Sequence, residues 1–283
     1  MAIGAYANLG NRAVIDVGGA DALSFLQGLI TNNMEHVSET QAIYAALLTP
    51  QGRFLHDFFI IEYLGRFMVD IDAQHAAAFI KRLNLYKLRA RVEISDITSH
   101  WAVCAIIPEN KQVQIVTDLV RGPIYQDPRH EKLGLRAIVA KGNDYWAELK
   151  EISELEYDSL RISLCIPTTG HELIPEKSFL LDYGFEELKG VDFDKGCYVG
   201  QEVIARTKHR SLVKRRLFLI ETSVELNAAN QTEIMSDEII AGEVLSVSEN
   251  RATALLRIDL VAKGGLTIGG TPITPKLPDW VKP

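Results

Sequence analysis

The segment Lys195 to Glu202, with the sequence KGCYVGQE, contains the residue best suited to chemistry, Cys197. The run from Gln201 to about His209 is compatible with a helix, and Gly200 permits the backbone angles of a turn in front of it. The free N–H groups of a helix N-terminus and the positive charge of Lys195 both favour the thiolate form of a nearby cysteine. We therefore predict that Cys197 is a reactive thiol, assisted by Lys195.

The alternative for any cysteine is a small buried apolar side chain without chemistry. Cys104, in WAVCAII, and Cys165, in SLCIP, have apolar neighbours and fit that role. Cys197 differs from them because charged residues, glycines and a helix start surround it. Three scattered cysteines are also too few for a disulfide framework or a complete zinc site, so we expect no metal bound by the isolated chain.

The elements that must position this segment alternate without βαβ regularity. Helical spacing follows Gly19, where Asp21 is a candidate N-cap, and returns over 73–85 and 144–162. Strand-like runs of β-branched and aromatic residues cover 13–17, 42–48, 54–62, 67–71, 91–94 and 101–107. From Arg216 onward, short strand-like runs broken by Asn, Gly and Pro predict a small β-domain. The pattern predicts the α+β class.

Composition restricts the classes of partner. The 283 residues carry a net charge of −7, which opposes attraction to nucleic acid or an anionic membrane, although a local basic strip can depart from that average. No apolar run approaches about 18 residues, the length that spans a bilayer. The N-terminus lacks the basic start and apolar stretch of a signal peptide. We therefore expect a cytoplasmic protein, with neither a membrane nor nucleic acid as its partner.

The cysteine segment resembles the signature of the YgfZ-type folate-binding proteins, relatives of the aminomethyltransferase (T-protein) of the glycine cleavage system. Further segments resemble the same family, in the same order along nearly the whole chain. These are FLQGLITNN at 25–33, LLTPQGRFLHDF at 47–58, YKLRARVEI at 86–94, RISLCIPTTGHELIP at 161–175 and ARTKHRSLVKRRLF at 205–218. The cysteine motif is the specific part of the resemblance, and the residues after 218 add little to it.

The resemblance implies a T-protein-like fold, with two α+β domains and a C-terminal β-barrel-like domain around a central cavity. We place a discontinuous α+β domain, which carries the cysteine motif, at 1–42 and 115–210. The second α+β domain is then 43–114, and the β-barrel-like domain is 213–283. These boundaries are predictions.

The resemblance also implies tetrahydrofolate, or a derivative of it, as the ligand. It further implies a role in the assembly or repair of iron–sulfur proteins, with assembly or client proteins as partners. One cysteine cannot supply the four protein ligands usual for a cluster, so any cluster would be transient and shared with a partner through Cys197. A folate-dependent aminomethyltransferase, or another one-carbon transferase, is the alternative function.

The family's folate site suggests which residues contact the ligand. The candidates are Asp57, Glu172, Tyr198, Gln201, Glu202 and Arg206. A carboxylate such as Glu172 can accept two parallel hydrogen bonds from a pterin, and an aromatic ring can stack on it. The alternatives are a solvated loop for Glu172, a satisfied strand-end carboxylate for Asp57, a core position for Tyr198 and a solvated helix end for Arg206.

The sequence departs from the T-protein pattern at one position that matters for chemistry. T-proteins carry an Asp-Asp pair, and here the first aspartate is replaced by His56, in front of Asp57. Aminomethyl transfer needs an acid near the reactive folate nitrogen. The change therefore favours the accessory factor over the transferase.

Overall fold

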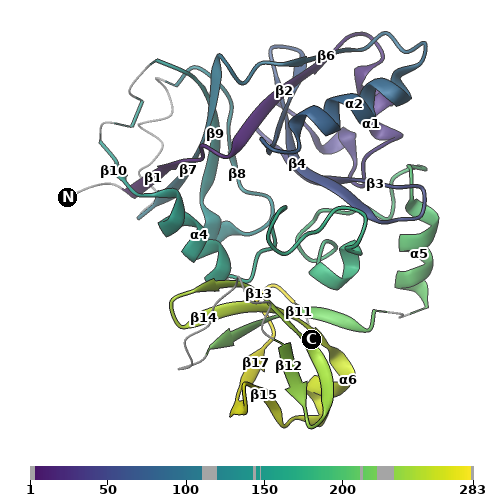
Figure 1. The fold of residues 1–283 in the computed structure, drawn as a ribbon. Coiled ribbons are helices and arrows are strands. Elements are labelled where there is room, and N and C mark those ends of the chain that lie inside the picture. The colour runs from purple at the N-terminus through teal and green to yellow at the C-terminus, as the bar shows by residue number, and fades with distance from the viewer. Residues whose placement is uncertain are drawn as a thin grey trace. The chain divides into compact units, whose positions relative to one another are not determined.

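The computed structural model describes residues 4–109, 120–142, 145–146, 148–210, 213–221 and 233–281. The chain divides into two compact units, and Figure 1 labels their helices and strands. The first unit contains Met1–Leu48, His56–Tyr157 and Lys189–Val199. The second contains Thr49–Leu55, Asp158–Leu188 and Gly200–Pro283. The cysteine motif therefore begins in the first unit and ends in the second.

The first unit contains two five-stranded sheets. One has the strand order β3 (Ile43–Leu48), β4 (Phe54–Tyr63), β5 (Arg66–Asp72), β2 (Arg12–Gly18) and β6 (Glu93–Asp96). The other has the order β10 (Lys150–Glu151), β1 (Gly4–Asn8), β7 (Trp101–Pro108), β9 (Leu135–Ala140) and β8 (Ile124–Gln126). Among the strand pairs whose register is given by the described residues of these sheets, β1 and β10 pair in parallel and the others are antiparallel.

Two helices, α1 (Ala22–Gln27) and α2 (Ala76–Lys87), lie side by side over the first of these sheets (Figure 1). Phe79 and Leu83 of α2 join Ile15 of β2 and Val69 of β5 in one buried apolar cluster. Because side chains alternate across a strand, Asp70, next to Val69, points to the opposite face of the sheet. That alternation decides where the charged residues of the core lie.

The second unit contains α4 (Glu154–Ser163), whose first four residues belong to the first unit, and α5 (Gln201–His209). It also contains a seven-stranded sheet of β16 (Thr271–Pro272), β15 (Leu266–Ile268), β12 (Glu233–Ser236), β13 (Ile239–Ser248), β14 (Arg251–Arg257), β11 (Arg215–Glu221) and β17 (Thr274–Lys276), in that order. Helix α6 (Ile258–Lys263) and short 3-10 turns are the remaining elements within the described residues. The apolar cluster inside the sheet includes Ile220, Val244 and Leu256.

The sequence-based elements are largely confirmed, with two differences. The helical spacing over 144–162 becomes a helix only from Glu154, because β10 occupies Lys150–Glu151, and residues 144 and 147 lie outside the described part of the chain. Asp21 does not cap α1 with its side chain. Its carboxylate accepts from the backbone N–H and the guanidinium of Arg91 instead, because two charge-assisted bonds outweigh a cap.

Candidate functional site

The Cys197 side chain is exposed, whereas Cys104 and Cys165 are buried, as the sequence predicts. Helix α5 begins at Gln201, and Gly200 precedes it with a φ of +84°, in the left-handed region that favours glycine. On the other side of the turn, Val199 packs against the apolar cluster of the first unit. The chain is therefore anchored close to the cysteine while the thiol itself meets solvent.

Lys195 is buried, and its ammonium group is held by backbone carbonyls. Its Nζ donates to the oxygens of Gln27, Ile30 and Asn32, at 2.8, 2.7 and 2.6 Å. These carbonyls lie at the end of α1 and in the turn after it, where a helix leaves acceptors without intrahelical donors. Burial lowers the pKa of Lys195 to about 8, and the charge of Asp192 opposes that shift, so the ammonium persists at neutral pH.

The residues before Lys195 are attached to the same turn. Thr31 donates its hydroxyl to the carbonyl of Gly190 at 2.6 Å, and the Asn32 amide donates to the carbonyl of Lys189 at 2.7 Å. In return, the backbone N–H of Asp192 donates to the carbonyl of Thr31 at 3.0 Å. All three donors of Lys195 are also committed to this turn. We therefore assign Lys195 the role of holding the Cys197 loop in place.

Tyr198 is largely buried, and the ammonium of Lys195 lies 5.1 Å from the centre of its ring. Within the described residues, its buried hydroxyl has no hydrogen-bond partner. Burial raises the pKa of Tyr198, so the phenol stays neutral. The buried ring therefore packs beneath the loop, next to the ammonium of Lys195. Its predicted stacking on a folate stays a prediction.

The other predicted contacts that follow the cysteine lie on α5, in the second unit. Gln201 is half-buried, whereas Glu202 and Arg206 are exposed. Glu202 lies in the first turn and Arg206 in the last, where each charge complements the helix dipole. Their folate contacts stay predictions.

Glu172 is fully buried in the second unit, so the solvated-loop alternative is wrong. Its Oε1 accepts from Arg161 at 3.0 Å and Thr253 at 2.9 Å, and its Oε2 accepts from Arg161 at 3.0 Å and the N–H of Thr168 at 3.1 Å. Burial alone raises the pKa of this carboxyl, but the charge of Arg161 and the hydrogen bonds outweigh it and leave the pKa lowered. Protein donors thus occupy the four acceptor positions of the carboxylate.

Asp57 is buried in β4, in the first unit, and accepts a hydrogen bond from the hydroxyl of Tyr44 at 2.9 Å. Its neighbour His56 is also buried, with the ring of His75 5.6 Å away and that of Phe79 5.8 Å away. Burial, followed by the charges of His75 and Arg82, lowers the pKa of His56 to about 4. His56 is therefore neutral at pH 7 and has no proton to donate as an imidazolium.

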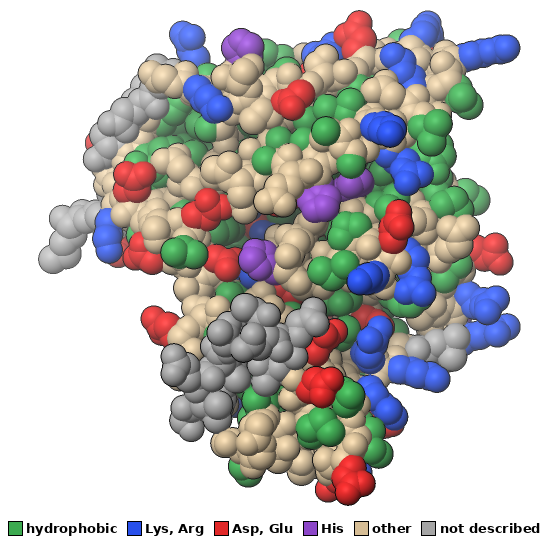
Figure 2. Space-filling model, in the orientation of Figure 1, with side chains coloured by type: hydrophobic (Ala, Val, Ile, Leu, Met, Phe, Trp, Pro, Cys, Tyr) green, Lys and Arg blue, Asp and Glu red, His purple; other side chains and the backbone are tan. Residues whose placement is uncertain are grey.

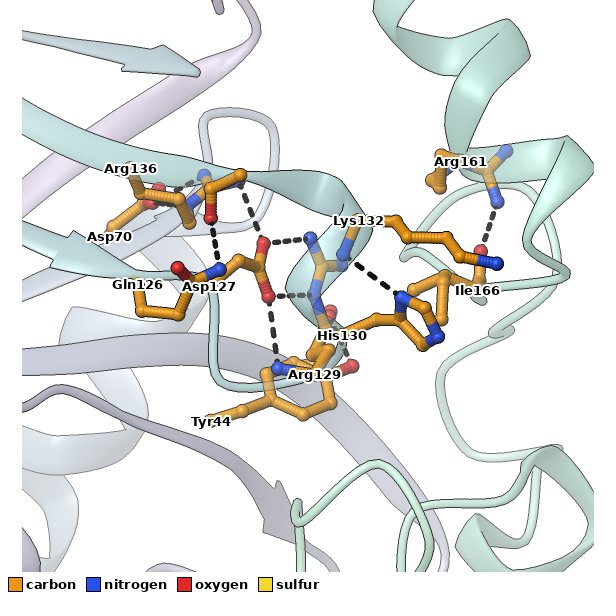
Figure 3. Close-up of polar contacts among 12 residues, drawn as sticks. Tyr44, Asp70, Gln126, Asp127, Arg129, His130, Lys132, Arg136, Arg161 and Ile166 are labelled. Carbon is orange, nitrogen blue, oxygen red and sulfur yellow. Dashed lines mark hydrogen bonds and ion pairs between the residues drawn. The ribbon is translucent and has the colours of Figure 1, made fainter. Parts of the chain in front are cut away.

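A network of buried charges, which sequence reasoning did not single out, connects the two sheets of the first unit. Asp70 accepts from Arg12 at 2.6 Å and from Arg136 through Nε at 3.0 Å. Asp127 accepts from Arg129 at 3.0 and 2.8 Å (Figure 3). Figure 3 shows Arg129 between Asp127 and Tyr44, whose ring centre is 5.5 Å from the guanidinium carbon. The sequence feature that could have indicated this network is a charged residue between apolar residues of a strand, such as Asp70 in β5.

In the described part of the chain, no three His, Cys, Asp or Glu side chains gather in a way that could hold a metal ion. Likewise, none of the described helices combines the length and apolarity needed to cross a bilayer.

The chain has similarities to known proteins along most of its length. Residues 8–114 match the GCVT N-terminal domain, and residues 214–283 match the CAF17 C-terminal beta-barrel domain. A mitochondrial "iron-sulfur cluster assembly factor IBA57 homolog" from Dictyostelium discoideum is 30% identical over 82% of this chain and 65% of its own length. The IBA57 assembly factor of Mus musculus is 28% identical over 96% of this chain and 84% of its own length. The chain resembles IBA57-type iron–sulfur assembly factors.

A solved structure gives the fold. Aminomethyltransferase T of the glycine cleavage system from Bartonella henselae aligns with a TM-score of 0.76, over 99% of this chain and 87% of its own, at 15% identity. Together with the two matched domains, this confirms the predicted class, a mixed α+β protein with a T-protein-like fold and a C-terminal β-barrel domain. The domain boundaries stay predictions.

The comparisons bear on two further predictions. The resemblance to iron–sulfur assembly factors related to the T-protein is confirmed in this coarser form, and the relatives are IBA57-type factors, whereas the motifs indicated the bacterial YgfZ type. The cytoplasmic location is wrong, because these relatives are mitochondrial proteins. The chain spans 65% of the Dictyostelium discoideum protein and 55% of the Mycosarcoma maydis homologue, so it corresponds to about half to two thirds of those relatives.

Proposed function

We propose that the chain is an accessory factor for the assembly or repair of iron–sulfur proteins and that the Cys197 thiolate is its reactive group. The observation that carries this proposal is an exposed thiol on a loop that the buried Lys195 holds in place through hydrogen bonds to backbone carbonyls. The similarity to proteins named as iron–sulfur cluster assembly factors supports the same conclusion.

Cys197 would act as one ligand of a cluster whose other ligands belong to a partner protein. A thiol loses its proton to solvent when its sulfur binds iron, and an exposed side chain allows both steps. A loop held in one conformation presents the sulfur at a defined place without paying ordering entropy at each encounter. Lys195 is then a positioning residue, because its ammonium faces the carbonyls of the α1 turn.

We also propose tetrahydrofolate, or a derivative, as a ligand. Asp57, Tyr198, Gln201, Glu202 and Arg206 are the candidate contacts. Glu172 is the weakest of the predicted contacts, because a pterin would have to displace Arg161, Thr253 or the N–H of Thr168 from its carboxylate.

A folate-dependent aminomethyltransferase is the second candidate function. The aminomethyltransferase fold is compatible with it. His56 argues against it, because burial lowers its pKa to about 4 and leaves no acid at neutral pH at the place of the missing aspartate.

The deciding experiment is the restoration of iron–sulfur enzyme activities in a deletion strain. Cys197→Ser removes the ionisable sulfur from an exposed position, so the variant should fold like the wild type yet restore no activity. Cys104→Ser and Cys165→Ser place a hydroxyl in a buried site and should instead lower stability. Full restoration by Cys197→Ser at normal expression would overturn the thiolate mechanism.

Folate binding is tested separately, by thermal unfolding with and without tetrahydrofolate. A ligand at about 100 times its Kd stabilises the native state by about 2.7 kcal/mol, which raises the melting temperature. A glycine cleavage aminomethyltransferase serves as the positive control. No shift for this chain, when the control shifts, would remove folate and leave the thiolate proposal intact.

A further inference from the structure

The C-terminal half of α2 and the turn that follows it form the most uniformly basic surface segment of the first unit. Between Ala73 and Val92 the chain has five Lys or Arg residues and no Asp or Glu, although the whole protein carries a net charge of −7. The cations are Lys81, Arg82, Lys87, Arg89 and Arg91. Figure 2 shows Lys and Arg side chains gathered at the corner where Figure 1 places α2.

The charges in this segment are mostly uncompensated. Arg91 is paired with Asp21 at 3.0 Å. Within the described residues, Lys81, Lys87 and Arg89 have no ionic partner. Elsewhere on the surface, cations such as Lys263 and Lys276 lie within 3 Å of a carboxylate. The α2 segment therefore keeps a local positive potential that the average charge of the chain conceals.

Two leucines protrude among these cations. Leu85 is 66% exposed and Leu88 is 88% exposed, whereas Phe79 and Leu83 on the opposite face of α2 are buried against the sheet. Leu88 ends the helix with a φ of +45° and a ψ of −107°, a conformation that is strained for a residue with a Cβ. The turn thus holds an aliphatic side chain clear of the protein surface at a conformational cost.

We propose that this segment, Lys81 to Arg91, is a docking surface for an anionic phospholipid bilayer. Cations attract the headgroup phosphates, and the two leucines enter the boundary of the acyl chains, as in helices that lie in a membrane interface. A rigid protein partner would need a pocket shaped to Leu88, which stands almost free of its own surface, whereas acyl chains accept it without one. The net charge of −7 and the lack of a bilayer-spanning apolar run predict no membrane partner, but this segment departs from the average charge and needs only to lie on the bilayer surface.

The test is sedimentation of the full chain with vesicles of equal parts phosphatidylcholine and phosphatidylglycerol, and with vesicles of phosphatidylcholine alone. The wild type should bind the first kind and not the second, and high salt should release it. Each Lys or Arg near an anionic surface contributes about fivefold in affinity, so Lys81→Gln with Lys87→Gln and Arg89→Gln should weaken binding by about 100-fold. The matched control is Lys141→Gln with Lys177→Gln and Arg210→Gln, which removes the same charge from scattered exposed positions.

The leucines need a control of their own. Leu85→Ser with Leu88→Ser should weaken vesicle binding at least about tenfold, without changing the melting temperature, since both side chains are exposed. Ile239→Ser with Ile240→Ser is the control, because these isoleucines are about half exposed but follow Asp237 and Glu238. This control should bind like the wild type.

Three results would overturn the proposal. The first is a wild type that does not sediment with anionic vesicles, and the second is a charge control that loses as much binding as the α2 variant. In the third, the α2 variants bind vesicles normally but fail to restore activity in the deletion strain, which would assign the surface to an acidic protein partner. Vesicle binding and the melting temperature are independent of Cys197, so a failure of the vesicle tests leaves the thiolate proposal intact.

Discussion

The network around Asp70 and the loop of Cys197 both keep cations out of water, but with opposite kinds of partner. Asp70, a carboxylate, forms ion pairs with the guanidinium groups of Arg12 and Arg136. Lys195 is surrounded by neutral carbonyls of Gln27, Ile30 and Asn32, and no carboxylate touches its ammonium within the described residues. The network pairs each guanidinium with a carboxylate and joins two sheets, whereas the lysine fixes one loop and leaves a neighbouring thiol exposed.

The comparison predicts that removing charge is most damaging where charges are paired and buried. Asp70→Asn leaves the buried Arg12 without a counter-charge and leaves Arg136 only the more distant Asp127, at 3.8 Å, so we expect a loss of about 3–5 kcal/mol in the free energy of unfolding, measured with urea. Asp237→Asn breaks the exposed pair with Lys263, where solvent screens the charges, and should leave the free energy of unfolding nearly unchanged. Equal losses in the two variants would contradict the distinction.

Glu172→Gln tests the same principle in the second unit, with an expected loss of about 3 kcal/mol. The amide presents only one oxygen to the donors of Arg161, Thr168 and Thr253, and Arg161 loses its buried charge partner and keeps only the partly exposed Asp158. Because the pKa of Glu172 is lowered in the folded state, its stabilisation is present above the ordinary pKa of a glutamate and is lost as the pH falls through the lowered value. Glu221→Gln, at an exposed pair with Lys276, is the control, and unchanged stability of Glu172→Gln would return this residue to a ligand-binding role.

Lys195→Met tests the buried cation that is held by neutral carbonyls instead of a carboxylate. It removes three hydrogen bonds to carbonyls without removing an ion pair, so we expect a smaller loss of about 2–3 kcal/mol. The local effect should be larger, with amide exchange at Asp192 and Lys195 at least about tenfold faster than in the wild type. Lys189→Met, at an exposed lysine of the same loop, should change neither quantity. Normal protection in Lys195→Met would show that the loop does not depend on the ammonium.

His56 sharpens the comparison because it is a buried titratable group without a counter-charge. Its pKa falls from 6.5 to about 4 on folding, so the unfolded chain binds a proton first as the pH drops. Stability from this residue is present above pH 6.5 and decreases as the pH falls towards 4, by about 2 kcal/mol between pH 7 and pH 5. His56→Leu should reduce the pH dependence of urea unfolding by that amount, whereas an unchanged dependence would show that another group titrates.

Local patterns predicted most of the elements but not the partners of buried charges. The run Gln201–His209 forms the helix expected from its composition, and the apolar neighbours of Cys104 and Cys165 correctly placed both in the core. The sequence suggested either a ligand or solvent as the partner of Glu172. It could not indicate Thr253 as a donor, because this residue lies 81 residues away along the chain. A sequence pattern that reaches only a few residues contains no information about such a contact.

By itself, the sequence determined the α+β class, the periodicity of its helices and strands and the setting of Cys197 in front of a helix. These properties depend on steric preferences and spacing within one segment. Only the tertiary structure decided that Lys195 faces the α1 turn, 163 to 168 residues earlier in the chain, and that Asp70 meets Arg136, 66 residues later. A buried charge takes whichever acceptor or counter-charge folding brings within hydrogen-bond distance, and the cost of leaving it unpaired makes that choice a property of the whole core.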